Sequence, residues 1–141
     1  MRNILLLISM LGLLPAGCGR TVSDTDTVSC DTFVYSVKGG DSLRLDRYTD
    51  TPAAEIDAKK PCMIFVFGGA FISGTRDAES YRPFFEYMAR EQGYTVVSID
   101  YRLGMKKAMQ AGTLSEETFP EAWITTLAMA TGDLYDATAY V

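Results

Sequence analysis

The chain contains no histidine among its 141 residues, and it has only three cysteines. Without an imidazole, its own side chains lack the usual general base that activates a serine or cysteine nucleophile. The cysteine spacing matches no zinc site, and there is no histidine to complete one, so we expect neither a metal nor a cofactor. The net charge is −5, whereas a protein that binds nucleic acid usually carries a positively charged surface. We therefore do not expect nucleic acid as a partner.

The N-terminal apolar run is also short. It covers residues 4–14, whereas a membrane span needs roughly 20 apolar residues. The run follows Arg2 and ends in small residues, which is the pattern of a secretory signal peptide. We therefore predict a signal peptide over residues 1–17 and an exported protein.

Cys18 directly follows this segment and resembles the acylated cysteine of a bacterial lipobox, although Pro15 stands where an aliphatic residue is common. We expect a lipid anchor at Cys18 that holds the protein at a membrane of the cell envelope, with the chain in the outer membrane or periplasm. Ordinary cleavage near Gly17, which would give a soluble periplasmic protein, is the alternative. Residues 18–31 are polar and predict a tether.

The remaining residues, 32–141, are enough for one domain. Two stretches of alternating apolar and polar residues, 32–38 and 42–48, flank two glycines and predict a β-hairpin. The apolar run 62–67 is typical of a strand buried on both faces. Cys30 and Cys62 are free to form a disulfide in an exported chain, but a small core residue is the simpler interpretation of Cys62.

The second half of the domain alternates helical and strand patterns. Residues 77–92 carry apolar side chains at helical spacing, with Pro83 suited to the first turn and Gly93 to the end. Residues 94–100 predict a strand that completes a parallel βαβ unit. We expect a loop over 105–114 and then a further helix. That helix begins at residues 115–117, and its apolar positions are Trp123, Ile124, Leu127, Ala128, Leu134, Tyr135 and Val141. The order predicts an α/β fold.

The stretch "VFGGAFISG", residues 66–74, has three interpretations. A phosphate loop needs Lys followed by Ser or Thr after the last glycine, and this chain has Thr75 and Arg76 there. The glycines could simply turn the chain from strand to helix. The third interpretation is an oxyanion hole, in which backbone N–H groups stabilise the negative charge that develops during acyl transfer.

Three motifs in order favour the third interpretation. "VFGGAFISG" resembles an HGGG-like motif, "SIDYRLG" (98–104) resembles a "DYRL" motif and "LRLDRY" (43–48) resembles an "L.LDvY" motif. Together they make residues 33–104 similar to the N-terminal half of an α/β-hydrolase of the esterase or lipase type. The resemblance implies a three-layer sandwich when complete, and hydrolysis of small-molecule or polysaccharide-linked carboxylic esters, such as acetyl or feruloyl esters.

The same resemblance assigns the site residues. The backbone N–H groups of Gly69 and Ala70 would be the oxyanion donors, and Gly68 would give the loop room to turn. Phe67 replaces the histidine of the motif, and we expect it to line the pocket. In this family the catalytic acid follows the serine, so we expect Asp100 and Arg102 to fix loops by hydrogen bonds and ion pairs. We expect Trp123 and the aromatic residues of 81–87 to be core.

The chain lacks the rest of the family's machinery. No G-x-S-x-G pentapeptide occurs, and there is no histidine. We therefore interpret residues 32–141 as the N-terminal part of a hydrolase domain, truncated before the nucleophile elbow. The alternative is a non-catalytic envelope lipoprotein or an inactive remnant. In this fold, strand 62–67 would lose a neighbour and become an exposed apolar edge, so we expect residues 18–141 alone to be poorly soluble or molten.

Overall fold

The computed structural model describes residues 27–50 and 60–141. The predicted signal peptide, Cys18 and most of the predicted tether lie outside the described residues. The described chain has α/β character, as predicted. Its elements are β1 (Ser29–Lys38), β2 (Asp41–Thr49), β3 (Cys62–Val66), α1 (Arg82–Arg90), β4 (Thr95–Ile99), α2 (Gly104–Gln110) and α3 (Phe119–Tyr140).

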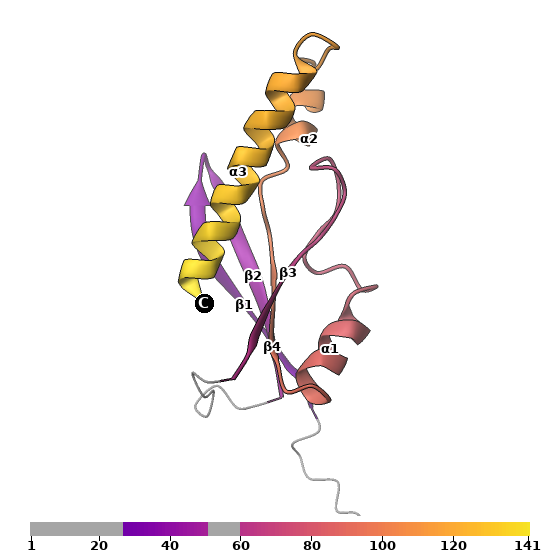
Figure 1. The fold of residues 1–141 in the computed structure, drawn as a ribbon, viewed down its shortest axis with the longest axis vertical. Coiled ribbons are helices and arrows are strands. Elements are labelled where there is room, and N and C mark those ends of the chain that lie inside the picture. Colours follow the sequence, from indigo (N-terminus) through magenta and orange to yellow (C-terminus); the bar gives the residue numbers. More distant parts are fainter. Residues whose placement is uncertain (1–26, 51–59) are drawn as a thin grey trace, which may run out of the picture.

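The four strands form one mixed sheet in the order β1-β2-β4-β3 (Figure 1). β1 and β2 are the predicted antiparallel hairpin, and Gly39 and Gly40 form its turn with φ of +59° and +84°. Positive φ at both central positions is the requirement of a type I′ turn, which explains the two glycines. β3 and β4 pair in parallel on either side of α1, which confirms the βαβ unit. β1 begins at Ser29, so the last three residues of the predicted tether pair with β2.

Helices cover both faces of the sheet. On one face, Leu45, Val97 and Ile99 pack with Ala137 of α3. On the other face, Tyr48 and Val96 pack with Phe85 of α1. Neighbouring residues of β4 point to opposite faces because side chains alternate along a strand, so α1 and α3 form separate layers around the same sheet.

β3 is an edge strand of the sheet, as the sequence analysis predicted for a chain without a further strand. Cys62 and Val66 are exposed, although the run 62–67 has the composition of a strand covered on both faces. Cys30 and Cys62 are both free and exposed, so the interpretation of Cys62 as a core residue is wrong. The edge position is the physical reason, because it leaves the strand without a neighbour on one side.

The helix boundaries differ from the sequence prediction in three places. α1 is shorter than the predicted 77–92, although Pro83 does lie in its first turn and Gly93, with φ of +69°, follows its end. The predicted loop 105–114 is wrong over its first half, because α2 occupies Gly104–Gln110 and buries Met105 completely. α3 begins at Phe119 after a turn. In that turn Ser115 and Thr118 hydrogen-bond each other's backbone N–H, which delays the start of the helix.

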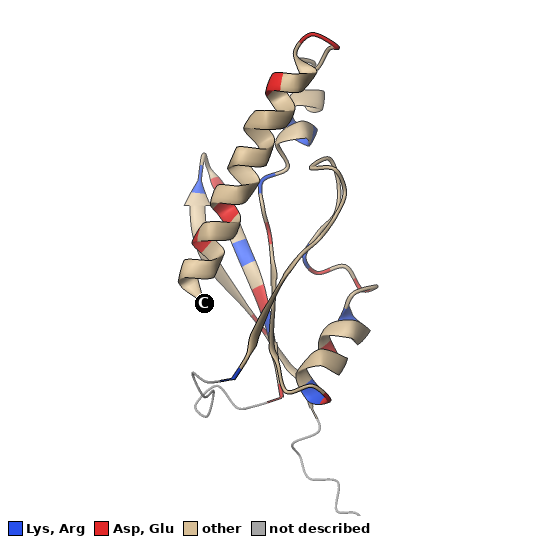
Figure 2. Ribbon diagram, in the orientation of Figure 1, with Lys and Arg blue, Asp and Glu red and all other residues tan. Residues whose placement is uncertain are grey.

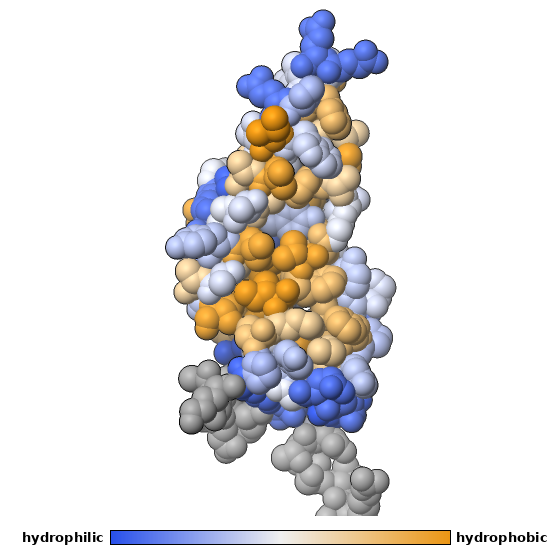
Figure 3. Space-filling view, in the orientation of Figure 1, coloured by the Kyte–Doolittle hydropathy of each residue, from blue (hydrophilic) through white to orange (hydrophobic). Residues whose placement is uncertain are grey.

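α3 presents most of its large apolar residues outward. Tyr135 is 75% exposed and Leu127 is 50% exposed, whereas Thr126, Asp133 and Ala137 are the residues that the helix buries. Figure 3 shows apolar side chains gathered on the face of the molecule that carries α3. Despite this composition, no helix within residues 27–50 and 60–141 is long and apolar enough to cross a membrane.

Candidate active site

The glycine-rich segment forms a tightly bent loop directly after β3. Because β3 and β4 are parallel, their C-terminal ends lie side by side, and this loop is therefore next to the residues that follow β4. Gly69, Ala70 and Phe71 have φ of +132°, +53° and +59°, so the chain runs through three consecutive left-handed residues. The carbonyl of Gly69 closes the bend by accepting hydrogen bonds from the N–H groups of Ile72 at 3.0 Å and Ser73 at 3.2 Å.

The two predicted oxyanion donors lie in this bend. Gly69 and Ala70 are exposed, and neither amide donates to an acceptor anywhere in residues 27–50 and 60–141. A backbone N–H is a strong donor that is normally paired when buried, and here both are open to solvent or a ligand. Chemically, the bend therefore offers adjacent free donors on a fixed backbone, which is what a developing oxyanion needs.

The glycines of the loop serve different purposes. A side chain at Gly69 would collide with the carbonyl oxygen of Ser73, so a tight bend requires glycine there. A Cβ at Gly74 would lie 2.5 Å from the Phe67 ring and 2.6 Å from the Gly68 oxygen, and its φ is +105°. Gly68 has ordinary φ and open space around it. The role of Gly74 was not predicted, because nothing in the local sequence pattern shows that an aromatic ring lies against it.

Phe67 is buried beneath the loop, whereas the sequence analysis predicted that it lines a pocket. It is 4% exposed, and its ring stacks on that of Tyr101 with centroids 4.4 Å apart. The Tyr101 hydroxyl donates to the Phe67 carbonyl at 2.8 Å, and burial raises the pKa of this phenol, which keeps it protonated as a donor. Phe67 is buried because it fills the space between Tyr101 and Gly74, so it supports the loop from beneath.

Asp100 and Arg102 have the structural roles that we predicted. Asp100 accepts hydrogen bonds from Arg76 at 3.1 and 3.2 Å and from the N–H of Arg44 at 3.2 Å. Arg102 contacts both oxygens of the fully buried Asp133 of α3, at 2.8–3.1 Å. The hydrogen bonds to Asp133 raise the pKa of Arg102 above its ordinary value.

The predicted core aromatic residues divide into two groups. Phe85 is buried against Tyr48 and Phe65, as expected. The prediction is wrong for Phe84 and Tyr87, which are 47% and 49% exposed on the outer side of α1. Trp123 of α3 is only half-buried, and its ring meets Phe71 of the loop edge-on with centroids 5.4 Å apart. Trp123 therefore contacts the candidate site itself, although it was predicted only as core.

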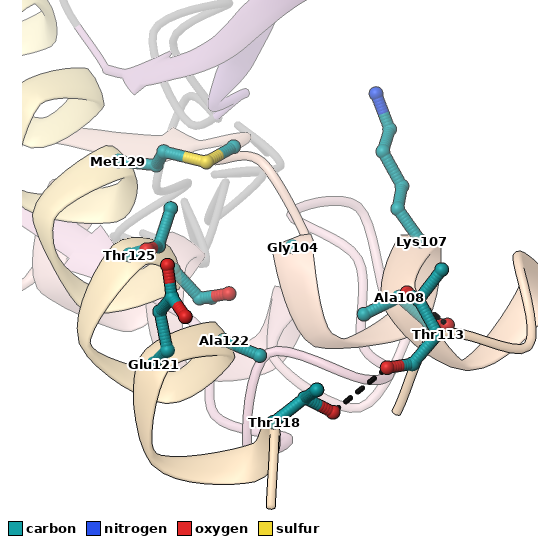
Figure 4. A pocket seen from close by; sticks show the side chains of 10 residues that line it. Gly104, Lys107, Ala108, Thr113, Thr118, Glu121, Ala122, Thr125 and Met129 are labelled. Atoms are coloured by element: carbon teal, nitrogen blue, oxygen red, sulfur yellow. Dashed lines mark hydrogen bonds between the residues drawn. The ribbon is translucent and has the colours of Figure 1, made fainter. Parts of the chain in front are cut away.

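A separate groove of about 450 Å³ lies between α2 and α3 (Figure 4). Glu121, Thr125 and Met129 of α3 line one side, and Gly104 and Lys107 of α2 line the other. None of the lining residues belongs to the loop 67–76, so this groove is distinct from the candidate oxyanion donors. Within the described ranges, no three acidic or cysteine side chains come together as a metal site.

Comparison with known proteins identifies the chain's relatives. The profile described as "Carboxylesterase family" matches residues 16–112, which is more than half of the sequence. The chain belongs to the carboxylesterase family. Among solved structures, it is similar to a thermophilic esterase from the planctomycete Thermogutta terrifontis, with a TM-score of 0.56 and 25% identity. These matches confirm the α/β-hydrolase resemblance and the fold class.

Two curated relatives of this carboxylesterase-family chain are themselves much longer. A non-reducing polyketide synthase of Aspergillus terreus is 31% identical over 109 residues, which is 77% of this chain and 4% of the synthase. A probable N-octanoylanthranilate hydrolase of Rhodococcus erythropolis is 40% identical over 55 residues, which is 39% of this chain and 12% of the hydrolase. The match to the Thermogutta esterase covers 79% of this chain and 33% of the esterase chain. The matches thus cover a third or less of the length of each of these three proteins.

Proposed function

We propose that this chain provides part of the oxyanion hole of a carboxylic ester hydrolase whose nucleophile and histidine lie outside these 141 residues. The observation that supports the proposal is the exposed bend at Gly69 and Ala70, whose two amides have no acceptor in the described part of the chain. Family membership supports the reaction class, because carboxylesterases of this fold place oxyanion donors in the loop after the third strand.

The role of the loop in the reaction follows from charge. When a nucleophile attacks an ester, the carbonyl oxygen becomes negative, and the amides of Gly69 and Ala70 would each donate a hydrogen bond to it. Such a donor stabilises the transition state by about 2.7–4 kcal/mol, because it is oriented before the charge develops. A third donor in this fold is the N–H after the nucleophile, which this chain does not contain.

The substrate that we propose is a small-molecule carboxylic ester. Acetyl or feruloyl esters linked to polysaccharide belong to the same chemical class and are the finer form of the proposal. The ring of Phe71 and the half-buried Trp123 lie next to the proposed donors, and aromatic surfaces favour an apolar or aromatic part of a substrate.

We include export and lipid anchoring at Cys18 in the proposal, on the basis of the N-terminal sequence pattern. Expression of the whole gene in a bacterial host with labelled palmitate should give a labelled protein in the membrane fraction. The Cys18→Ser variant should lose the label. A labelled Cys18→Ser variant would contradict the anchor, and an unlabelled wild-type protein in the periplasm would favour ordinary signal cleavage.

The decisive experiment uses the protein encoded by the whole reading frame that contains this chain. It should hydrolyse p-nitrophenyl acetate or methyl ferulate. Gly69→Ala should lower kcat by about 10²–10³-fold, because the new methyl group collides with Ser73 and displaces the donors. Gly132→Ala is the matched control, since Gly132 lies in α3 with open space around it.

Two outcomes would contradict the proposal. An unchanged kcat in Gly69→Ala would remove the oxyanion role from this loop. Absence of hydrolysis by a folded wild-type protein would favour the alternative of a non-catalytic envelope lipoprotein or an inactive remnant.

A further inference from the structure

Both ends of the loop 67–76 are attached to the end of β4. At the start, the Tyr101 hydroxyl donates to the Phe67 carbonyl at 2.8 Å. At the C-terminal end of the loop, the Ser98 hydroxyl donates to the Arg76 carbonyl, also at 2.8 Å. In between, the N–H of Lys106 in α2 donates to the Phe71 carbonyl at 3.1 Å. The backbone of the loop is thus held at three points by residues that follow it by more than twenty positions.

Arg76 adds an ionic attachment to the last of these points. Its Nε lies 3.1 Å from Oδ2 of Asp46 in β2, and its Nη1 lies 3.1 Å from Oδ2 of Asp100 after β4. The side chains of Arg76 and Asp46 are 13% and 4% exposed, so this pairing is largely shielded from water. Removing the cation would leave a buried carboxylate without its counter-charge.

The two carboxylates are themselves held in place. Oδ1 of Asp46 accepts a hydrogen bond from Thr32 of β1 at 2.6 Å. Asp100 accepts from the Arg44 N–H at 3.2 Å, and its carbonyl accepts from the Tyr35 hydroxyl at 2.5 Å. Arg76 therefore connects the loop to a place where residues of β1, of β2 and of the segment after β4 are hydrogen-bonded to one another.

The loop needs such an attachment because its own conformation is unfavourable. Ala70 and Phe71 are consecutive non-glycine residues with positive φ, a backbone conformation that L-residues adopt only when their surroundings impose it. Ala70 is one of the two proposed donors, and the direction of its N–H depends on that φ. A loop released at one end would relax towards ordinary φ values and turn the amides away.

We propose that Arg76 is a positioning residue that fixes the Gly69 and Ala70 amides by tying the end of the loop to Asp46 and Asp100. The inference rests on the proposed function for its catalytic consequence, but the ordering of the loop is independent of it. Arginine suits this position because one planar guanidinium reaches two carboxylates at once, whereas the single ammonium of lysine reaches only one of them well.

The test compares Arg76→Lys with Arg82→Lys in the protein from the whole reading frame. Arg82, six residues after Arg76, is a matched control because it forms an exposed ion pair with Glu86. Arg76→Lys should speed hydrogen exchange of the Ile72 and Ser73 amides, which donate to the Gly69 carbonyl, by about tenfold, with exchange in β2 and β4 unchanged. Arg82→Lys should leave both unchanged.

Kinetics provide the second measurement. A misplacement of about 1 Å at a reacting centre costs about 10²-fold in rate, so Arg76→Lys should lower kcat by up to that factor while KM changes little. A loss of general stability would instead reduce the fraction of active enzyme without faster exchange confined to the loop. If Arg76→Lys does not fold, Asp100→Asn, which keeps the shape of the side chain, takes its place with the same expected direction.

The outcomes separate the two proposals. Unchanged exchange of the Ile72 and Ser73 amides in a folded Arg76→Lys protein overturns the positioning role, whatever the activity. Faster exchange of the loop with no reduction in kcat overturns its catalytic consequence. Faster exchange in a wild-type background that hydrolyses no ester supports Arg76 as the anchor of the loop and contradicts the proposed function instead.

Discussion

α1 and α3 cover opposite faces of the same sheet, but they do so by different means. α1 buries an aromatic side chain, Phe85, among other aromatic rings and turns its charged residues outward. α3 is more than twice as long, and it buries Thr126, Asp133 and Ala137 while exposing most of its large apolar residues. Figure 2 shows few charged positions along most of α3.

This difference in exposed apolar surface indicates which helix still lacks a packing partner within the described chain. α1 packs Phe85 and Ala89 against the sheet and leaves Phe84 and Tyr87 partly exposed. α3 has one side that is fixed by polar contacts, with Asp133 binding Arg102 and Asp136 contacting Lys38, and another side that is apolar and uncovered by the described residues. An apolar patch of this kind on a protein surface marks a place where another element or partner packs.

The largest expected effect concerns the α1 layer. Phe85→Ala should lower the free energy of unfolding by about 3–5 kcal/mol, because Phe85 is only 1% exposed and its loss leaves a cavity between α1 and the sheet. Urea titration followed by circular dichroism measures the change. Phe84→Ala, at the neighbouring exposed position, should cost less than about 1 kcal/mol. Equal costs at the two positions would mean that α1 does not pack as described.

The next effect concerns the polar contact beneath α3. Arg102→Met should destabilise the chain by about 3 kcal/mol, at the lower end of the range for breaking a buried pair, because Lys38 still lies 3.5 Å from Asp133. Arg82→Met, which breaks an exposed pair, should cost much less, because solvent screens that pair. The same titration detects both, and a negligible cost for Arg102→Met would show that α3 is held mainly by its few apolar contacts.

The smallest effect on stability should come from the outer face of α3. Replacing Leu127 and Tyr135 together by Gln should change the free energy of unfolding by no more than about 0.5 kcal/mol, since both side chains are exposed. The same variant should bind less of the dye ANS and scatter less light, because it removes apolar surface. This tests the expectation that residues 18–141 alone are poorly soluble. Thr131→Gln on α3 is the control, and equal dye binding by all three proteins would contradict the contrast with α1.

The parts of the fold that the sequence predicted correctly depend on local chemistry. Gly39 and Gly40 between two alternating segments indicate a hairpin because only a few turns fit, and Pro83 and Gly93 bracket α1 for equally local reasons. The edge position of β3 was predicted from the strand order of the family that the chain resembles, because the apolar composition by itself indicates a strand covered on both faces. The assignment of Gly69 and Ala70 came from resemblance to a family, and it stays a prediction.

The errors arose where contacts between distant residues decide the structure. α2 has only seven residues, which are too few for a clear helical period in the sequence. It is held in place by the burial of Met105 and by the hydrogen bond from the Lys106 N–H to the Phe71 carbonyl. The burial of Phe67 depends on Tyr101, which lies 34 positions away. The ion pairs of Arg76 are invisible in the sequence because Asp46 and Asp100 lie far from it on either side.

The attachment of the loop to β4 also sets an order of events during folding. Tyr101 and Ser98, which hold the two ends of residues 67–76, belong to a segment synthesised later and separated from the loop by all of α1. Before β3 and β4 can pair in parallel, the stretch of chain between them, which includes α1, must bring the two strands together. Such non-local pairing is slow compared with the formation of a helix or a hairpin. The bend at Gly69 and Ala70 is therefore a late product of folding, and a nascent chain that ends before residue 98 has no means of holding it.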